Sequence, residues 1–189
     1  MCYILPNVSK KWYSRQNMIY YILPNVVFLL YLRQNIRIMS TIIGRRSEVE
    51  ELEKLYRSER PEFVAVYGRR RVGKTFLIKQ ALKGRITFQH TGVSPVDQEG
   101  ERNRMKTQLE SFYYSLLNHG LEGFKKPKSW MEAFFQLEQL LISLDDGSRQ
   151  VVFIDELPWM DTPRSGFLPA FESFWNGWCS GRDNLMLVV

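Results

Sequence analysis

The sequence predicts an α/β fold with a mostly parallel β-sheet. Short, continuous apolar runs of the kind found in strands buried on both faces recur along the chain. Longer stretches with apolar residues at helical spacing separate these runs. One glycine-rich turn connects the first run directly to a helical stretch. The expected strands are residues 63–67 (FVAVY), 86–90 (ITFQH), 151–155 (VVFID) and 185–189 (LMLVV).

The first helix is expected over residues 47–60. Ser47 and Glu50 have the spacing of a capping box, in which the serine caps a backbone N–H and the glutamate reaches back. Apolar residues at helical spacing continue to Tyr56, and Pro61 comes after the expected end.

The later helices are predicted in the same way, from apolar spacing and end signals. Ser129 and Glu132 repeat the capping-box spacing, and the turn residues 145–147 end the helix that they open. The expected helices are Lys74 to about Leu82, residues 97–118, the helix after Ser129, and one marked by Phe167, Phe171, Phe174 and Trp178.

Composition indicates one globular domain and gives little support to nucleic-acid binding. The chain has 189 residues and a formal net charge of +6. Residues 1–38 hold five basic and no acidic residues, whereas the remainder holds 21 basic and 20 acidic ones. The basic excess therefore lies in the N-terminal segment. The two cysteines, Cys2 and Cys179, provide neither a disulfide framework nor metal-ligand spacing.

The N-terminal segment contains a tandem duplication. YILPNV occurs at 3–8 and at 21–26, and residues 2–19 match residues 20–37 at ten of eighteen positions. An apolar run within it could be a signal peptide or membrane anchor, but it is short for a span of about 20 residues and Pro24 interrupts it. We expect residues 1–38 to be a non-native or disordered extension, with translation starting at Met39.

Residues 68–75 (GRRRVGKT) match the phosphate-binding pattern G-x-x-x-x-G-K-[ST] at every required position. The match lies between an expected strand and an expected helix, which is the context that the pattern requires. Gly68 and Gly73 allow the backbone to turn tightly and to approach phosphate groups closely.

The remaining residues of this loop have distinct expected roles. Backbone N–H groups from about Arg71 through Val72 to Thr75 would bind phosphate oxygens, aided by the helix N-terminus. Lys74 would reach the β- and γ-phosphates, and the Thr75 hydroxyl would ligate Mg²⁺. The three arginines at 69–71 occupy variable positions. We interpret them as solvated, although contact with a neighbouring subunit or a nucleic-acid phosphate stays open.

An acidic pair at the end of an apolar strand complements the loop. In VVFIDE (151–156), Asp155 would hold the Mg²⁺ shell through water. Glu156 would polarise the attacking water as a general base. A buried strand that ends in an acid is a weak motif alone, and the phosphate loop strengthens it. The additional glutamate favours ATP hydrolysis over phosphoryl transfer to a small molecule.

Three segments together resemble a known family. Residues 42–56 (IIGRRSEVEELEKLY), 66–78 (VYGRRRVGKTFLI) and 151–160 (VVFIDELPWM) are similar to the archaeal-type ATPase family of AAA+/STAND-like P-loop NTPases, which has many bacterial members. The resemblance covers about residues 41–189, with the motifs in the expected order.

The resemblance implies a three-layer sandwich with sheet order 5-1-4-3-2, the loop on strand 1 and the acidic pair on strand 3. It also implies that Ile43, Gly44 and Arg45 lie beside the adenine and ribose of the nucleotide. Family members usually continue with a sensor residue, a fifth strand, a helical lid and often a DNA-binding-like or nuclease-like domain.

The chain stops at Val189, inside the expected fourth strand. We therefore expect residues 39–189 to be a partial P-loop ATPase domain that binds ATP better than it hydrolyses it. The implied partners are a missing C-terminal lid and effector domain, DNA or a protein, and further copies of the chain. We expect a cytoplasmic location and no membrane association.

Two other functions stay open. In a nucleotide-gated switch, bound ATP would control a partner, and a single turnover would be followed by slow product release. In a small-molecule kinase, ATP consumption would require an added acceptor. Steady multiple turnover of the full-length relative would favour the ATPase hypothesis over the switch.

Overall fold

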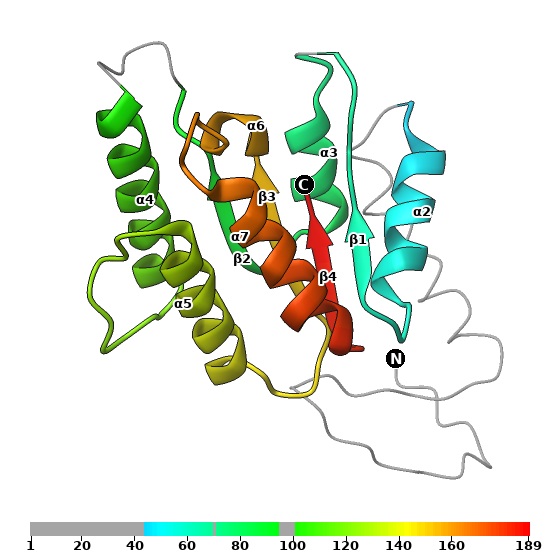
Figure 1. The fold of residues 1–189 in the computed structure, drawn as a ribbon. Helices are drawn as coiled ribbons and strands as arrows, with labels where there is room; N and C mark the ends of the chain where they lie inside the picture. The colour runs from blue at the N-terminus through cyan, green and yellow to red at the C-terminus, as the bar shows by residue number, and fades with distance from the viewer. Residues whose placement is uncertain (1–43, 70, 95–100) are drawn as a thin grey trace, which may run out of the picture. The chain divides into compact units, whose positions relative to one another are not determined.

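The computed structural model describes residues 44–69, 71–94 and 101–189. One or two α-helices separate each pair of successive strands along this part of the chain (Figure 1). In chain order they are α2 (Arg46–Tyr56), β1 (Glu62–Val64), α3 (Lys74–Ala81), β2 (Ile86–Thr91), α4 (Glu101–Asn118), α5 (Trp130–Ser143), β3 (Gln150–Asp155), α6 (Leu157–Met160), α7 (Phe167–Ser173) and β4 (Leu185–Val188).

The four strands form one parallel sheet in the order β1-β4-β3-β2. The predicted α/β class and the P-loop NTPase-type sandwich are therefore confirmed. Val66 follows β1 and Val189 follows β4, and Val66 N donates to Val189 O at 2.7 Å. The pairing of these two chain segments therefore continues beyond both strands toward the phosphate loop. The fifth strand of the expected order has no counterpart among the described residues.

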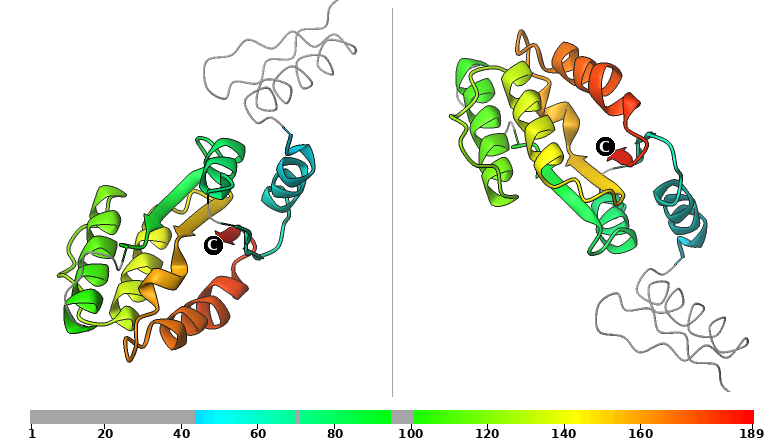
Figure 2. Two further views of the ribbon diagram at one scale, coloured as in Figure 1. Left: turned by 90° about the horizontal axis from the view of Figure 1, so that it is seen from above. Right: turned by 90° about the horizontal axis from the view of Figure 1, so that it is seen from below.

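The central strands are buried on both faces, which explains their unbroken apolar runs. Val151 and Phe153 of β3 pack with residues of α2 and α3, whereas Val152 and Ile154 pack with residues of α4, α5 and α7. Figure 2 shows α3 and α7 on opposite sides of the sheet. The sheet is therefore the middle layer of three.

The first helix begins within one residue of its expected start, but the predicted capping role of Ser47 is wrong. α2 begins at Arg46, and its first backbone bond runs from Val49 N to Arg45 O at 3.2 Å. Ser47 therefore lies inside the first turn, where its hydroxyl donates to Glu48 instead of accepting from the backbone. The helix also ends at Tyr56, before the expected end at residue 60.

The second predicted cap is confirmed. Ser129 precedes α5, and its Oγ accepts a hydrogen bond from Glu132 N at 3.2 Å. Glu132 Oε2 accepts from Lys128 N at 2.8 Å. At the other end, Asp145 Oδ1 accepts from Gly147 N, as the predicted turn requires.

Three other helices match the predictions within a few residues or extend them. α3 ends at Ala81, and the helix expected over 97–118 is described from Glu101, with residues 97–100 outside the described part. α7 continues into a π-helical turn, Phe174–Trp178. Phe167, Phe171 and Phe174 are core, and Trp178 is partly buried against it. The short helix α6, directly after the acidic pair, was not predicted.

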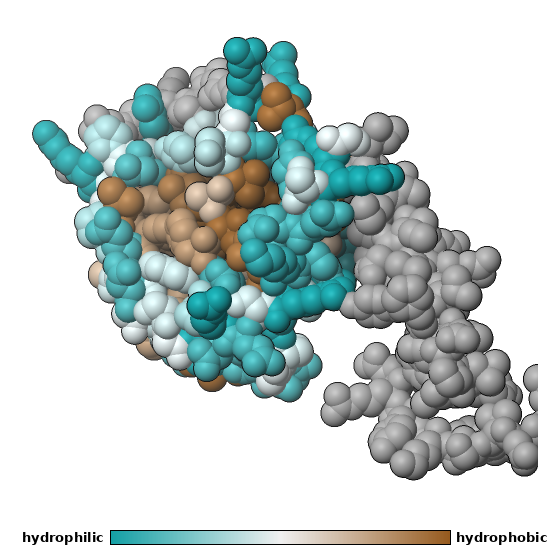
Figure 3. Space-filling model, turned by 90° about the vertical axis from the view of Figure 1, so that its right-hand side faces the viewer, coloured by the Kyte–Doolittle hydropathy of each residue, from teal (hydrophilic) through white to brown (hydrophobic). Residues whose placement is uncertain are grey.

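The side of the molecule that carries β1 has an apolar area within a hydrophilic surround (Figure 3). Phe63 of β1 is 42% exposed, and its ring packs edge-on against Trp175, with 5.1 Å between ring centroids. Within the described residues, no helix combines the length and apolar character needed to span a bilayer.

Candidate functional site

The loop between β1 and α3 has an unusual backbone. Arg71 and Gly73 both adopt left-handed conformations, with φ of 62° and 81°. Left-handed residues within such a loop turn successive N–H groups toward a common point, which forms a concave site for anions. A non-glycine residue in this region is uncommon, so the conformation of Arg71 marks a constrained backbone.

Lys74 folds back over the start of the loop. Its Nζ donates to Gly68 O at 3.0 Å and to Arg69 O at 3.3 Å. Gly73 precedes α3, and no side chain caps this end of the helix in the described structure. The first N–H groups of α3 therefore stay available to an anion.

The loop and the acidic strand meet through one side-chain contact. Thr75 Oγ1, in the first turn of α3, donates to Asp155 Oδ2 at 2.7 Å. The two residues lie 80 positions apart in the chain, and the contact is partly buried. Because parallel strands end at the same edge of a sheet, β1 and β3 deliver these residues to one place (Figure 1).

Glu156 follows Asp155 in a left-handed conformation, with φ 53° and ψ 41°, and precedes α6. Its N–H donates to Asp155 Oδ1 at 3.0 Å. A left-handed non-glycine residue costs about 1–3 kcal/mol, so the surrounding structure has to hold it. The side chain is exposed.

Arg45 reaches the phosphate loop from the N-terminus of α2. Its Nη2 donates to Val72 O at 2.5 Å, across 27 positions of sequence. Gly44, before it, has φ of 80°, a conformation that glycine adopts without strain. Ile43 lies outside the described residues.

The structure thus brings Arg45, the phosphate loop, Asp155 and Glu156 to one edge of the sheet.

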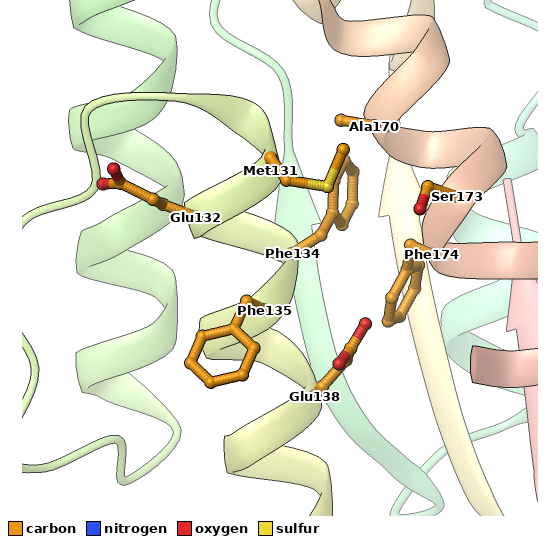
Figure 4. Close-up of a pocket in the computed structure, with 8 residues that line it drawn as sticks. All are labelled: Met131, Glu132, Phe134, Phe135, Glu138, Ala170, Ser173 and Phe174. Atoms are coloured by element: carbon orange, nitrogen blue, oxygen red, sulfur yellow. The ribbon is translucent and has the colours of Figure 1, made fainter. Parts of the chain in front are cut away.

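Two surface grooves lie elsewhere. A groove of about 360 Å³ between α5 and α7 has mainly apolar lining and includes Glu138, whose pKa burial raises (Figure 4). The other lies against α4 and residues 126–128. Neither is lined by a predicted site residue.

A family model described as an ATPase domain predominantly from Archaea matches residues 42–168. The chain belongs to this ATPase family. An uncharacterized ATP-binding protein of Methanocaldococcus jannaschii is 42% identical over 43 residues, which are 23% of this chain and 73% of that protein. The matched region of the ATPase domain includes the phosphate loop and the acidic pair.

Two features of this candidate site were missed in the sequence. The contact between Arg45 and Val72 joins segments that no local pattern connects. Gly92 N donates to Asp155 O at 3.0 Å, which places the residue after β2 against the acidic pair. A glycine directly after an expected strand was the available signal for a close backbone approach.

Proposed function

We propose that this domain binds ATP together with Mg²⁺ at residues 68–75 and hydrolyses it with Glu156 as general base. The observation that carries the proposal is the bond between Thr75 and Asp155, because it joins a phosphate loop to a strand-end carboxylate. Family membership supports ATP as the nucleotide, and so does the ATP-binding name of the archaeal relative.

The loop residues divide the binding of ATP among them. The backbone N–H groups from Arg71 to Thr75 bind phosphate oxygens. Lys74 leaves its carbonyl partners and contacts the β- and γ-phosphates, where its charge is better compensated. Gly44 and Arg45 would contact adenine and ribose, and Ile43, which lies outside the described residues, stays part of this prediction.

Thr75 and Asp155 suit a magnesium ion. Both offer oxygen atoms, the ligand type that Mg²⁺ prefers. The 2.7 Å between Thr75 Oγ1 and Asp155 Oδ2 supports their belonging to one coordination shell. Thr75 would ligate directly and Asp155 through water. The ion, when bound, neutralises charge on the β- and γ-oxygens.

Glu156 is placed to take a proton from water. It adjoins Asp155, its side chain is exposed, and its left-handed backbone turns the chain away from the direction of β3. A carboxylate held in this way can orient a water molecule against the γ-phosphate and accept its proton.

Binding is tested by isothermal titration with Mg-ATP, and Lys74→Ala should abolish measurable affinity. The matched control is Lys79→Ala, which removes an exposed lysine from the same helix and should leave binding intact. Equal affinity in Lys74→Ala and the parent would refute the loop assignment.

Hydrolysis is tested by phosphate release under single-turnover conditions. Glu156→Gln should bind ATP but release phosphate at least about 100-fold more slowly, within the usual contribution of a general base. Glu172→Gln, an exposed glutamate of α7, should behave as the parent does. With ATP in excess over the protein, one turnover followed by retained product would favour a nucleotide-gated switch, and dependence on an added acceptor would favour a kinase.

A further inference from the structure

Gln108 of α4 is a buried polar residue near the acidic pair. Its side chain is 1% exposed, and the amide makes three hydrogen bonds to backbone groups. Oε1 accepts from Val93 N at 2.9 Å, and Nε2 donates to Val93 O at 2.7 Å. Nε2 also donates to Trp159 O at 3.0 Å, so both amide hydrogens have acceptors.

These bonds join two loops at the edge of the sheet where ATP is proposed to bind. Val93 follows β2, and Trp159 belongs to α6, which follows β3. A polar group this deeply buried is costly to leave unpaired, so the amide holds both loops at fixed positions relative to α4.

The same two loops contact the backbone of Glu156. Trp159 N donates to Glu156 O at 2.9 Å, which closes the first turn of α6. On the other side, a Cβ atom added at Gly92 would lie 2.7 Å from Glu156 O. Glu156 O is therefore enclosed between α6 and the residue before Val93.

We propose that Gln108 is a positioning residue, which holds Glu156 in its left-handed conformation through Trp159 and Val93. The inference rests on the proposed role of Glu156 as general base. Gln108 itself has no contact with the phosphate loop among the bonds described above, so its effect should fall on the rate of hydrolysis and spare the affinity for ATP.

The test compares Gln108→Met with the parent chain, using ATP titration and single-turnover phosphate release. Methionine keeps the length of the side chain and removes all three hydrogen bonds. We expect affinity within about twofold of the parent and a hydrolysis rate lower by about 10- to 100-fold, as for a misplaced catalytic group. Hydrogen exchange should quicken at the Val93 amide, which loses its acceptor.

Gln136→Met is the matched control. Gln136 is also a buried glutamine, but it lies on α5 and donates to Lys125 O at 2.8 Å, away from the acidic pair. It should lower the melting temperature while leaving the hydrolysis rate within about twofold of the parent. A rate loss in Gln136→Met equal to that in Gln108→Met would show a general packing effect and overturn the inference.

Gly92→Ala acts on the same carbonyl, Glu156 O, and leaves Gln108 unchanged. This variant provides the test if Gln108→Met does not fold. The added Cβ presses on Glu156 O and should reproduce the rate loss with affinity retained. Gly177→Ala, whose Cβ would meet no atom within 4 Å, is its control.

The outcomes separate the two proposals. A parent chain that binds ATP and releases no phosphate would overturn the hydrolytic role of Glu156, and this inference with it. A parent that hydrolyses ATP, with Gln108→Met or Gly92→Ala at the parental rate, would overturn the positioning role alone.

Discussion

At the scale of single residues, Arg45 shows how a side chain outside the loop pattern can shape it. Its guanidinium donates to the carbonyl of Val72, inside the run whose N–H groups are proposed to bind phosphate. A bond of this kind restrains the peptide plane, because the carbonyl and the following N–H belong to the same rigid unit. Arg45 therefore has a structural role at the loop in addition to its proposed place beside adenine and ribose.

Arg45→Met should weaken ATP binding. A hydrogen bond from a charged group contributes about 1.5–3 kcal/mol, and partial exposure places this one near the lower end, so we expect roughly 10-fold lower affinity. Arg46→Met is the control, because Arg46 is an exposed neighbour of the same charge. Titration calorimetry measures the affinity of both variants for ATP. An equal loss of affinity in Arg45→Met and Arg46→Met would show that positive charge, and not the hydrogen bond to Val72, supports binding.

At the scale of elements, the two serines of the predicted capping boxes make a matched pair. Ser129 Oγ accepts from Glu132 N, whereas Ser47 lies inside α2 and bonds to Glu48. Ser129→Ala should lower the free energy of unfolding by about 1 kcal/mol, and Ser47→Ala should change it by less than about 0.5 kcal/mol. Urea denaturation gives both values. A larger loss in Ser47→Ala would contradict the described start of α2.

The strand β2 carries a histidine that should make stability depend on pH. Burial lowers the pKa of His90 from 6.5 to about 4. Ser115 Oγ donates to Ser111 O, so it accepts from His90 Nδ1, and Nε2 has no described partner. Protonation would place an unpaired charge in the core.

The sign of the dependence follows from proton binding. Between pH 6.5 and about 4, the unfolded chain binds a proton at His90 that the folded chain does not, so stability falls as pH falls. The loss should reach roughly 3 kcal/mol, at about 1.4 kcal/mol per pKa unit. Denaturation midpoints of the parent and His90→Asn should therefore diverge across this window. Parallel curves would show that His90 does not titrate differently in the two states.

At the scale of the whole molecule, residues 1–38 contain none of the proposed site residues. All residues proposed to contact the nucleotide or metal lie between Ile43 and Glu156. A chain that begins at Met39 should therefore bind Mg-ATP with the affinity of the full chain, within about twofold. Removal of the apolar run should also raise solubility. Titration of both chains measures this, and loss of binding or folding would make the segment part of the domain.

Much of the architecture could be predicted because local signals and tertiary structure agree. The apolar runs at 151–155 and 185–189 became β3 and β4, since a strand covered on both faces has to be apolar throughout. The phosphate loop was recognisable because each required residue type serves a local backbone or charge requirement. The acidic pair was found because it directly follows such a run.

The sequence by itself determined the α/β class, the strands, the phosphate loop and the family of this chain. Only the tertiary structure decided that Arg45 bonds to Val72, that Thr75 bonds to Asp155, and that Gln108 ties α4 to the loops after β2 and β3. Each of these bonds joins residues far apart in the chain, and no periodicity or spacing encodes such a pair. The cap at Ser47 was mispredicted for a related reason: the serine pattern permits a cap, but the path of the chain at Arg45 sets where the first turn closes.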